Sequence, residues 1–389
     1  MIILLQNLPP IPSSGPPLRC RTKFPTLVCV VASNNAQKPD KIKPKTRIKI
    51  KEPDDYHATL RALNSKGRIP RKALGQHYML NGEVNEQLVD AAKVGDGDMV
   101  LEIGPGTGSL TNVLVESGAT ILAIEKDPYM AALVRDRFAS TQRVKVLLFH
   151  VFSLVEINLT TTTKPLITFH SHQQIMKVVQ EDFTRCHLRS HLSSYMEGSD
   201  PSDLNPYAKV VANIPFNIST DVVKQLLPMG DIFSEVVLLL QEEAALRMVD
   251  PSLRTSEYRP INIFINFYSD PEYKFKVPRE NFFPQPKVDA AVVVFRLKQT
   301  VDYPQVSSTK SFFSMVNSAF NGKRKMLRKS LQHITSSLEI EEALVNIGLP
   351  ATFVIFFDPP MIVGFFVQSR PEELTLKDFV KLHNLIVDI

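Results

Sequence analysis

Gly104, Gly106 and Gly108 stand at alternate positions between an apolar run, 99–103, and a segment of helical character. A chain that turns from a strand into a helix needs permissive backbone angles, and a ligand lying across the turn needs backbone without side chains in its way. The spacing differs from the Gly-x-Gly-x-x-Gly fingerprint of dinucleotide sites and lacks the Lys-Ser/Thr ending of a phosphate-binding loop. Nicotinamide cofactors and nucleoside triphosphates are therefore disfavoured, and a tight connection without a ligand stays an alternative.

Glu125 ends a second apolar run, 119–124, about twenty residues after the glycines. Doubly wound folds place a carboxylate there, which accepts hydrogen bonds from two ribose hydroxyls. An exposed Glu before the Asp127-Pro128 turn is the alternative. Together the two patterns predict parallel strands whose carboxyl ends meet at one edge and bind a cofactor that contains ribose.

The composition is that of a soluble globular protein. The 389 residues, 44% hydrophobic and 22% charged, predict two domains with tails. A net charge of +5 allows a polyanionic partner without requiring one. Three cysteines without paired spacing indicate neither a metal site nor a disulfide framework, and the opening run 1–5 is too short for a membrane anchor. We expect no metal and no membrane association.

Residues 1–54 are predicted to be a transit peptide and a basic linker. No acidic residue precedes Asp40, and Arg and Lys are interleaved with Ser, Thr and Pro. This composition is typical of organelle targeting, with a disordered tail as the alternative. The Ser, Thr and Pro content favours the chloroplast over the mitochondrion.

An Asn-x-Pro-aromatic tetrapeptide, 213–216, ends a third apolar run. It resembles the motif of N6-adenine methyltransferases, and residues 72–388 resemble the KsgA-type ribosomal RNA adenine dimethyltransferase family. In that resemblance the side-chain oxygen of Asn213 and a main-chain carbonyl near Pro215 hold the two amino hydrogens of an extruded adenine, on which Phe216 stacks. The family usually carries Tyr at the last position, so Phe216 keeps the stacking face and loses a hydroxyl.

The resemblance implies S-adenosylmethionine as methyl donor and further site residues. The implied cofactor contacts are His77, Met79, Gly104, Glu125, Asp182 and Asn213. Asp182 corresponds to the acid that binds the adenine amino group of the cofactor. Phe283 lies in a Phe-x-Pro-x-Pro-Lys-Val segment and is expected to form the other side of the target-base pocket.

The predicted architecture is a doubly wound, Rossmann-like class I methyltransferase domain over residues 55–306 and a small α-helical domain over residues 307–389. Phe312 and Val316 have helical spacing in the second domain. Its concentrated positive charge is the candidate surface for ribosomal RNA, with a solvated helix face as the alternative. The candidate RNA-binding residues are Lys323, Arg324, Lys325, Arg328 and Lys329.

Two segments, 147–179 and 353–368, interrupt the family pattern. The run 144–146 should continue directly into 180–182, yet a similar run recurs at 176–179. We expect the later copy to serve as the strand while the residues before it loop out. Both segments resemble translated intervening sequence, which is a hypothesis based on the interrupted motifs.

The function expected from the resemblance is N6,N6-dimethylation of adjacent adenosines near the 3′ end of small-subunit rRNA, by a monomer acting on the immature small ribosomal subunit. The run 213–220 also resembles resistance-type methylases of large-subunit rRNA. A non-catalytic RNA-binding assembly or transcription factor is the third possibility.

Overall fold

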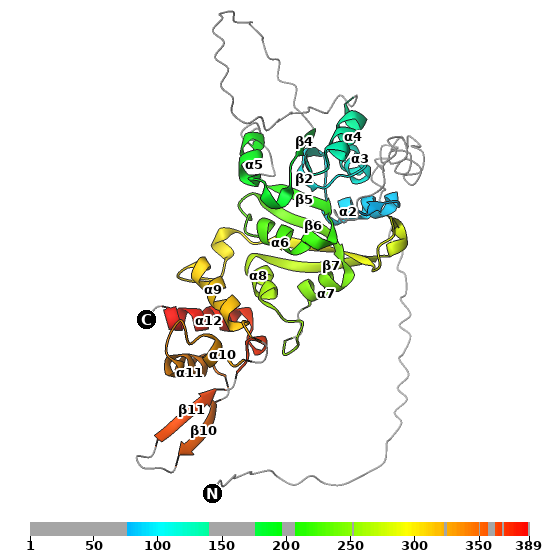
Figure 1. Cartoon of the computed structure of the whole chain (residues 1–389). Helices are drawn as coiled ribbons and strands as arrows, with labels where there is room; N and C mark the ends of the chain where they lie inside the picture. The colour runs from blue at the N-terminus through cyan, green and yellow to red at the C-terminus, as the bar shows by residue number, and fades with distance from the viewer. Residues whose placement is uncertain are drawn as a thin grey trace, which may run out of the picture. The chain divides into compact units, whose positions relative to one another are not determined.

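A seven-stranded sheet in the order β4-β3-β2-β5-β6-β9-β7 forms the centre of the fold (Figure 1). The computed structural model describes residues 76–139, 176–196, 207–250, 253–322, 325–349, 351–356, 362–367 and 369–387. The strands of the sheet are β2 (Met99–Ile103), β3 (Thr120–Glu125), β4 (Met176–Gln180), β5 (Ala208–Asn213), β6 (Phe233–Gln241), β7 (Ser269–Val277) and β9 (Ala290–Leu297). Strands β2 to β6 run parallel, and β9 is antiparallel to both β6 and β7.

Helices cover both faces of this sheet because successive strand side chains point to opposite sides. Val100 on β2 belongs to an apolar core shared with α2, α3 and α4, whereas its neighbour Leu101 belongs to a core shared with α5 to α8. The helices are α2 (Gly82–Ala91), α3 (Ser109–Glu116), α4 (Pro128–Phe138), α5 (Leu188–Met196), α6 (Ser219–Leu226), α7 (Glu242–Val249) and α8 (Pro260–Tyr268). The doubly wound prediction is confirmed.

The C-terminal helices continue the core on the α8 side. Phe267 of α8 packs on Phe312 of α9 with ring centroids 5.4 Å apart. These helices are α9 (Thr309–Ala319), α10 (Leu327–Ser330), α11 (Ser337–Asn346) and α12 (Leu376–Val387). The short 3₁₀ turns are η2 (Phe183–Arg185), η3 (Phe216–Ile218), η4 (Arg279–Asn281), η5 (Thr300–Asp302) and η6 (Pro371–Glu373). The predicted boundary at 306/307 falls between the last sheet strand and α9.

The segment 353–368, predicted to be an atypical insert in the helical part, includes strands. It contributes to an antiparallel hairpin of β10 (Ala351–Phe356) and β11 (Ile362–Val367), visible in Figure 1. Both runs are rich in Phe, Ile and Val, which favour strands, and Pro359-Pro360 between them favours a turn. The hairpin therefore falls on the segment that the sequence sets apart from the helical pattern around it.

The later copy of the duplicated run forms the edge strand. Residues 176–179 lie in β4, which pairs with β3 in parallel, so this end of the predicted insert is an integral part of the sheet. Residues 140–175 and the transit-peptide prediction at 1–54 lie outside the described residues. Among the helices that the structure describes, none has the length and apolar character needed to cross a membrane.

Candidate active site

One cavity lies at the carboxyl ends of β2, β3, β4 and β5. Parallel strands bring their ends to the same edge of the sheet, where α/β folds bind ligands. The predicted site residues in its lining are His77, Met79, Gly104, Glu125, Asp182, Asn213, Pro215 and Phe216. The sheet order therefore assembles residues that are up to 139 positions apart in the sequence.

The glycine turn has left-handed backbone angles, with φ of 68° at Gly104, 58° at Gly106 and 80° at Gly108. Such angles are strained for other residues. A Cβ at Gly106 would lie 3.1 Å from the ring of Tyr78, and one at Gly108 would lie 2.9 Å from Phe138. The turn therefore has no room for side chains at these positions, and its backbone faces the cavity directly.

Glu125 is a buried carboxylate held by two main-chain donors. The Gly106 N–H donates to Oε2 at 3.1 Å, and the Asp127 N–H donates to Oε1 at 2.8 Å. Burial raises the pKa of Glu125, and these backbone hydrogen bonds offset part of that effect. Each oxygen keeps a lone pair, so the fixed carboxylate can accept the two hydroxyl hydrogens of a ribose.

Asp182 lies beside Glu125, just after β4. Lys126 Nζ is 2.9 Å from its Oδ2, and both the N–H and the hydroxyl of Thr184 donate to Oδ1, at 3.1 and 2.8 Å. The hydrogen bond from Lys126 chiefly lowers the pKa of Asp182, so the carboxylate stays ionised. An ionised acceptor at the cavity wall suits an exocyclic amine.

Asn213 ends β5, and the tetrapeptide it begins turns into η3. The Pro215 carbonyl accepts from the Ile218 N–H at 3.2 Å. The ring of Phe216 stacks near that of His77, with centroids 6.1 Å apart and 24° between the planes. His77 Nδ1 is 2.6 Å from the Pro284 carbonyl, and because a carbonyl only accepts, Nδ1 carries the proton.

The entry segment and the Phe-x-Pro-x-Pro segment are joined by backbone pairing. β1 (Tyr78–Met79) pairs antiparallel with β8 (Phe282–Phe283). Neighbouring residues of β8 point to opposite sides, so Phe282 is 2% exposed and lines the cavity, whereas Phe283 is 39% exposed and is not among the lining residues. Of the predicted catalytic residues, Phe283 alone is not brought into this lining.

Residues 68–352 match the family model described as ribosomal RNA adenine dimethylase. The chain belongs to this family. It is 63% identical to the "Ribosomal RNA small subunit methyltransferase, chloroplastic" of Arabidopsis thaliana, over 86% of this chain and 84% of that protein. It is 32% identical to the "Ribosomal RNA small subunit methyltransferase A" of Protochlamydia amoebophila, over 83% of this chain and 93% of that protein. Membership makes this chain an S-adenosylmethionine-dependent methyltransferase.

Two solved structures share the fold. A dimethyladenosine transferase from Plasmodium falciparum aligns with a TM-score of 0.52 and 21% identity, over 78% of this chain and 95% of that chain. The 23S rRNA methyltransferase ErmE aligns with a TM-score of 0.51 and 18% identity, over 80% of this chain and 99% of that chain. At these identities the likeness concerns architecture alone.

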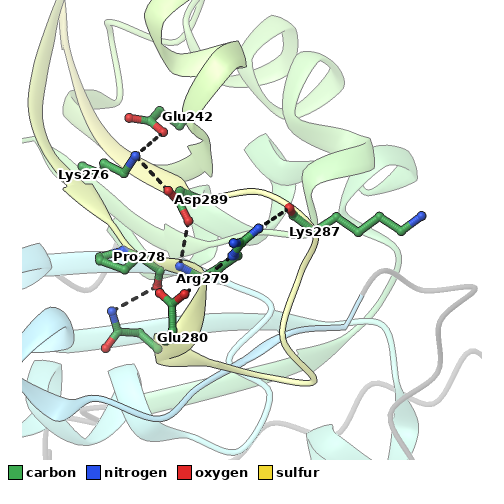
Figure 2. A network of polar contacts seen from close by, with 8 residues as sticks. Glu242, Lys276, Pro278, Arg279, Glu280, Lys287 and Asp289 are labelled. Atoms are coloured by element: carbon green, nitrogen blue, oxygen red, sulfur yellow. Dashed lines mark hydrogen bonds and ion pairs between the residues drawn. The ribbon is translucent and has the colours of Figure 1, made fainter.

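A polar network fixes the loop that carries the family's Phe-x-Pro-x-Pro-Lys-Val segment (Figure 2). Lys276 Nζ lies 2.9 Å from Glu242 and 2.8 Å from Asp289. The Arg279 N–H donates to Asp289 at 3.1 Å, and its guanidinium donates to the Lys287 carbonyl at 3.0 Å. The hydrogen bond from Lys276 chiefly lowers the pKa of Asp289. Both ends of the loop are thereby tied to β7 and α7, while the Lys287 side chain points away from the network (Figure 2).

A second buried acid in the cavity was not predicted from the sequence. Glu102 on β2 is 1% exposed and accepts at Oε2 from the Thr111 hydroxyl at 2.7 Å. Burial raises its pKa from the usual 4.5 to about 8. An acid inside the apolar run 99–103 was the available signal, since charged residues are rarely buried without a reason.

The residues present fit S-adenosylmethionine. The cavity combines a ribose-type carboxylate at Glu125, bare backbone at Gly106, and buried oxygens that lack donors. Among the described residues, Glu102 Oε1 and Asn85 Oδ1 have no hydrogen-bond partner, and both residues line the cavity. Buried acceptors without donors are costly, so they point to a ligand that supplies N–H groups.

The predicted RNA-binding cations have different surroundings. Lys325 and Lys329 are exposed, whereas Arg328 donates to the buried carboxylate of Glu341 at 3.1 Å. Glu341 is only 8% exposed at its side chain, so Arg328 supports the packing of α10 on α11. Lys323 and Arg324 lie outside the described residues.

Proposed function

We propose that this chain transfers methyl groups from S-adenosylmethionine to N6 of adjacent adenosines near the 3′ end of small-subunit rRNA, in ribosome biogenesis in the chloroplast. The observation that carries the proposal is that Asn213, an amide suited to hold an adenine amine, shares one cavity with the glycine turn and Glu125. The 63% identity to a chloroplastic small-subunit rRNA methyltransferase supports both the substrate and the compartment.

The order of the strands indicates how the cofactor lies along the edge of the sheet. Asp182 follows β4, Glu125 ends β3 and Gly104 follows β2, and these three strands are neighbours. A nucleoside placed with its adenine at Asp182 and its ribose at Glu125 has its amino-acid end over the glycine turn. The next strand is β5, which ends at Asn213, so the reactive end of the cofactor faces the residue that holds the acceptor amine.

When bound, S-adenosylmethionine supplies a methyl group on a sulfonium leaving group. The N6 lone pair of adenine is delocalised into the ring, and two acceptors for its hydrogens draw it out of conjugation. We assign the first to the Asn213 side-chain oxygen. We assign the second to the Ile214 carbonyl, because the Pro215 carbonyl already accepts from Ile218. Phe216 stacks on the base and fixes its plane, and in-line positioning of this kind contributes several kcal/mol.

RNA recognition is proposed for exposed groups around the cavity. An extruded base meets Phe216 on the inside, and the exposed ring of Phe283 is available to contact it from the outer side. Lys325 and Lys329, together with Lys323 and Arg324, are proposed to contact phosphates. We propose that the chain acts as a monomer on the immature small ribosomal subunit.

The test is methylation of immature small ribosomal subunits by the full chain with radiolabelled S-adenosylmethionine, followed by digestion of the RNA and detection of dimethyladenosine. Asn213→Ala should abolish the product and leave RNA binding unchanged. Asn112→Ala, the same change on the outer side of α3, is the matched control and should retain activity. Wild-type product mapped to large-subunit rRNA would favour the resistance-type alternative, and no product in any RNA would favour the binding-factor alternative.

A further inference from the structure

Asn85 stands at a helix position where an apolar side chain would be expected. It is 0% exposed on α2, whose other buried side chains include Val84, Leu88 and Val89. A buried amide costs free energy unless its polar atoms are satisfied. Asn85 also lines the cavity that the glycine turn borders, so its amide is part of the candidate site as well as of the core.

One end of the Asn85 amide is fixed by the protein. Its Nδ2 donates to the Ser109 hydroxyl at 2.8 Å, and Ser109 begins α3 directly after Gly108. This bond orients the amide, and within the described part of the chain Oδ1 is left as a buried acceptor without a donor. An oriented acceptor of this kind is complementary to a ligand donor.

A second unsatisfied oxygen in the same cavity belongs to a carboxyl group, whose ionised form a bound cation would stabilise. Glu102 Oε1 has no partner among the described residues, whereas Oε2 is held by Thr111. An amide oxygen and a carboxylate oxygen together suit a group with several N–H donors and a positive charge, which is a primary ammonium. Glu102 lies on β2, between the ribose acid on β3 and the acceptor amide on β5. This is where the amino-acid end of the cofactor falls in the proposed function.

We infer that Asn85 is a further cofactor-binding residue, whose Oδ1 accepts a hydrogen bond from the α-ammonium of S-adenosylmethionine beside the carboxylate of Glu102. The inference rests on the proposed function and deepens it by assigning the recognition of the amino-acid end. Ser109 is the positioning residue, because its hydroxyl accepts from Nδ2 and so fixes the orientation of the amide.

The experiment is calorimetric titration of the full chain with two probes. S-adenosylhomocysteine carries the amino-acid end, and 5′-methylthioadenosine lacks it. Asn85→Leu should weaken S-adenosylhomocysteine binding about ten- to a hundredfold, as expected for a lost hydrogen bond to a charged group. Binding of 5′-methylthioadenosine should stay within about twofold, because no ammonium is present to lose. Asn85→Ala serves if the leucine variant does not fold, and Ser109→Ala should give a smaller, equally selective loss.

If the substitution weakened the binding of both probes equally, the inference would be overturned, because Asn85 would then shape the glycine turn without contacting the ammonium. Unchanged binding of both would also overturn it, since Oδ1 would then be satisfied by solvent. Wild-type chain that binds neither probe would overturn both the inference and the proposed function. Selective loss for S-adenosylhomocysteine without any dimethyladenosine in the methylation assay would leave the inference standing and refute the proposed function alone.

Discussion

Replacing Glu102 by Gln should make the stability of this protein less dependent on pH. The substitution keeps the size of the side chain and keeps an oxygen that can accept from the Thr111 hydroxyl, which lies 2.7 Å away. It removes a carboxyl whose pKa burial raises to about 8. Because the folded chain holds this proton more tightly than the unfolded chain, the group stabilises the fold fully below its usual pKa of 4.5 and loses that contribution as pH rises through 8.

The magnitude follows from the two pKa values. Between pH 6 and pH 8 the folded carboxyl goes from fully to half protonated while the unfolded one is ionised throughout. Integrating the proton difference gives a loss of about 2 kcal/mol in the free energy of unfolding of the wild-type chain. The Gln variant has no such loss. For a chain of 389 residues the difference corresponds to a relative shift of about 2–3 °C in melting temperature.

The assay is urea denaturation of both chains at pH 6 and pH 8, followed by circular dichroism, since the chain has no Trp to report by fluorescence. The free energy of unfolding of the Glu102 variant should rise relative to that of the wild-type chain as the pH increases from 6 to 8. Glu116→Gln makes the same chemical change at an exposed position of α3 and should show no widening. Parallel pH dependences for wild type and the Glu102 variant would refute the burial argument.

Three further outcomes are expected. Gly106→Ala, which needs a Cβ at a φ of 58°, should weaken S-adenosylhomocysteine binding at least tenfold in calorimetry while circular dichroism is unchanged; wild-type affinity would contradict the close-approach argument. Lys209→Met should lower the free energy of unfolding, measured in urea, by about 3–5 kcal/mol, because Asp98 is only 14% exposed and loses its cation. A loss below about 1 kcal/mol, the value of a surface ion pair, would contradict this assignment of a buried pair. Lys329→Gln should reduce the slope of log affinity for rRNA against log salt by about one, whereas Arg328→Gln should mainly lower the melting temperature; the reverse pattern would contradict their assignment.

The parts of the site that the sequence predicted are those where chemistry and local structure coincide. Glu125 and Asn213 each end a strand-like apolar run and Gly104 directly follows one, so a local pattern gives both the residue type and its place at the sheet edge. The parallel order of strands follows from the same pattern together with the family resemblance. Asp182 was expected at the site despite the interruption because the later run, 176–179, lies just before it, and the structure places it in the cavity lining.

The parts that the sequence did not predict depend on partners far away in the chain. The sequence around Arg328 does not indicate that it pairs with Glu341. The sequence around Lys276 does not indicate that it bridges Glu242 and Asp289. Asn85 reads as an ordinary polar residue of an amphipathic helix until its complete burial is known. Such roles are set by tertiary contacts, which local propensity does not encode.

The pairing of β1 with β8 joins the two halves of the site. Tyr78 stands opposite Phe283 in this ladder, and its ring lies 3.1 Å from the position of a Cβ at Gly106. Tyr78 therefore connects the strand position of Phe283 with the packed glycine turn. The network around Asp289 holds the same loop from its other end. Under the proposed function, this continuous set of contacts is what aligns the methyl group with the acceptor amine, because it joins residues that lie on different strands.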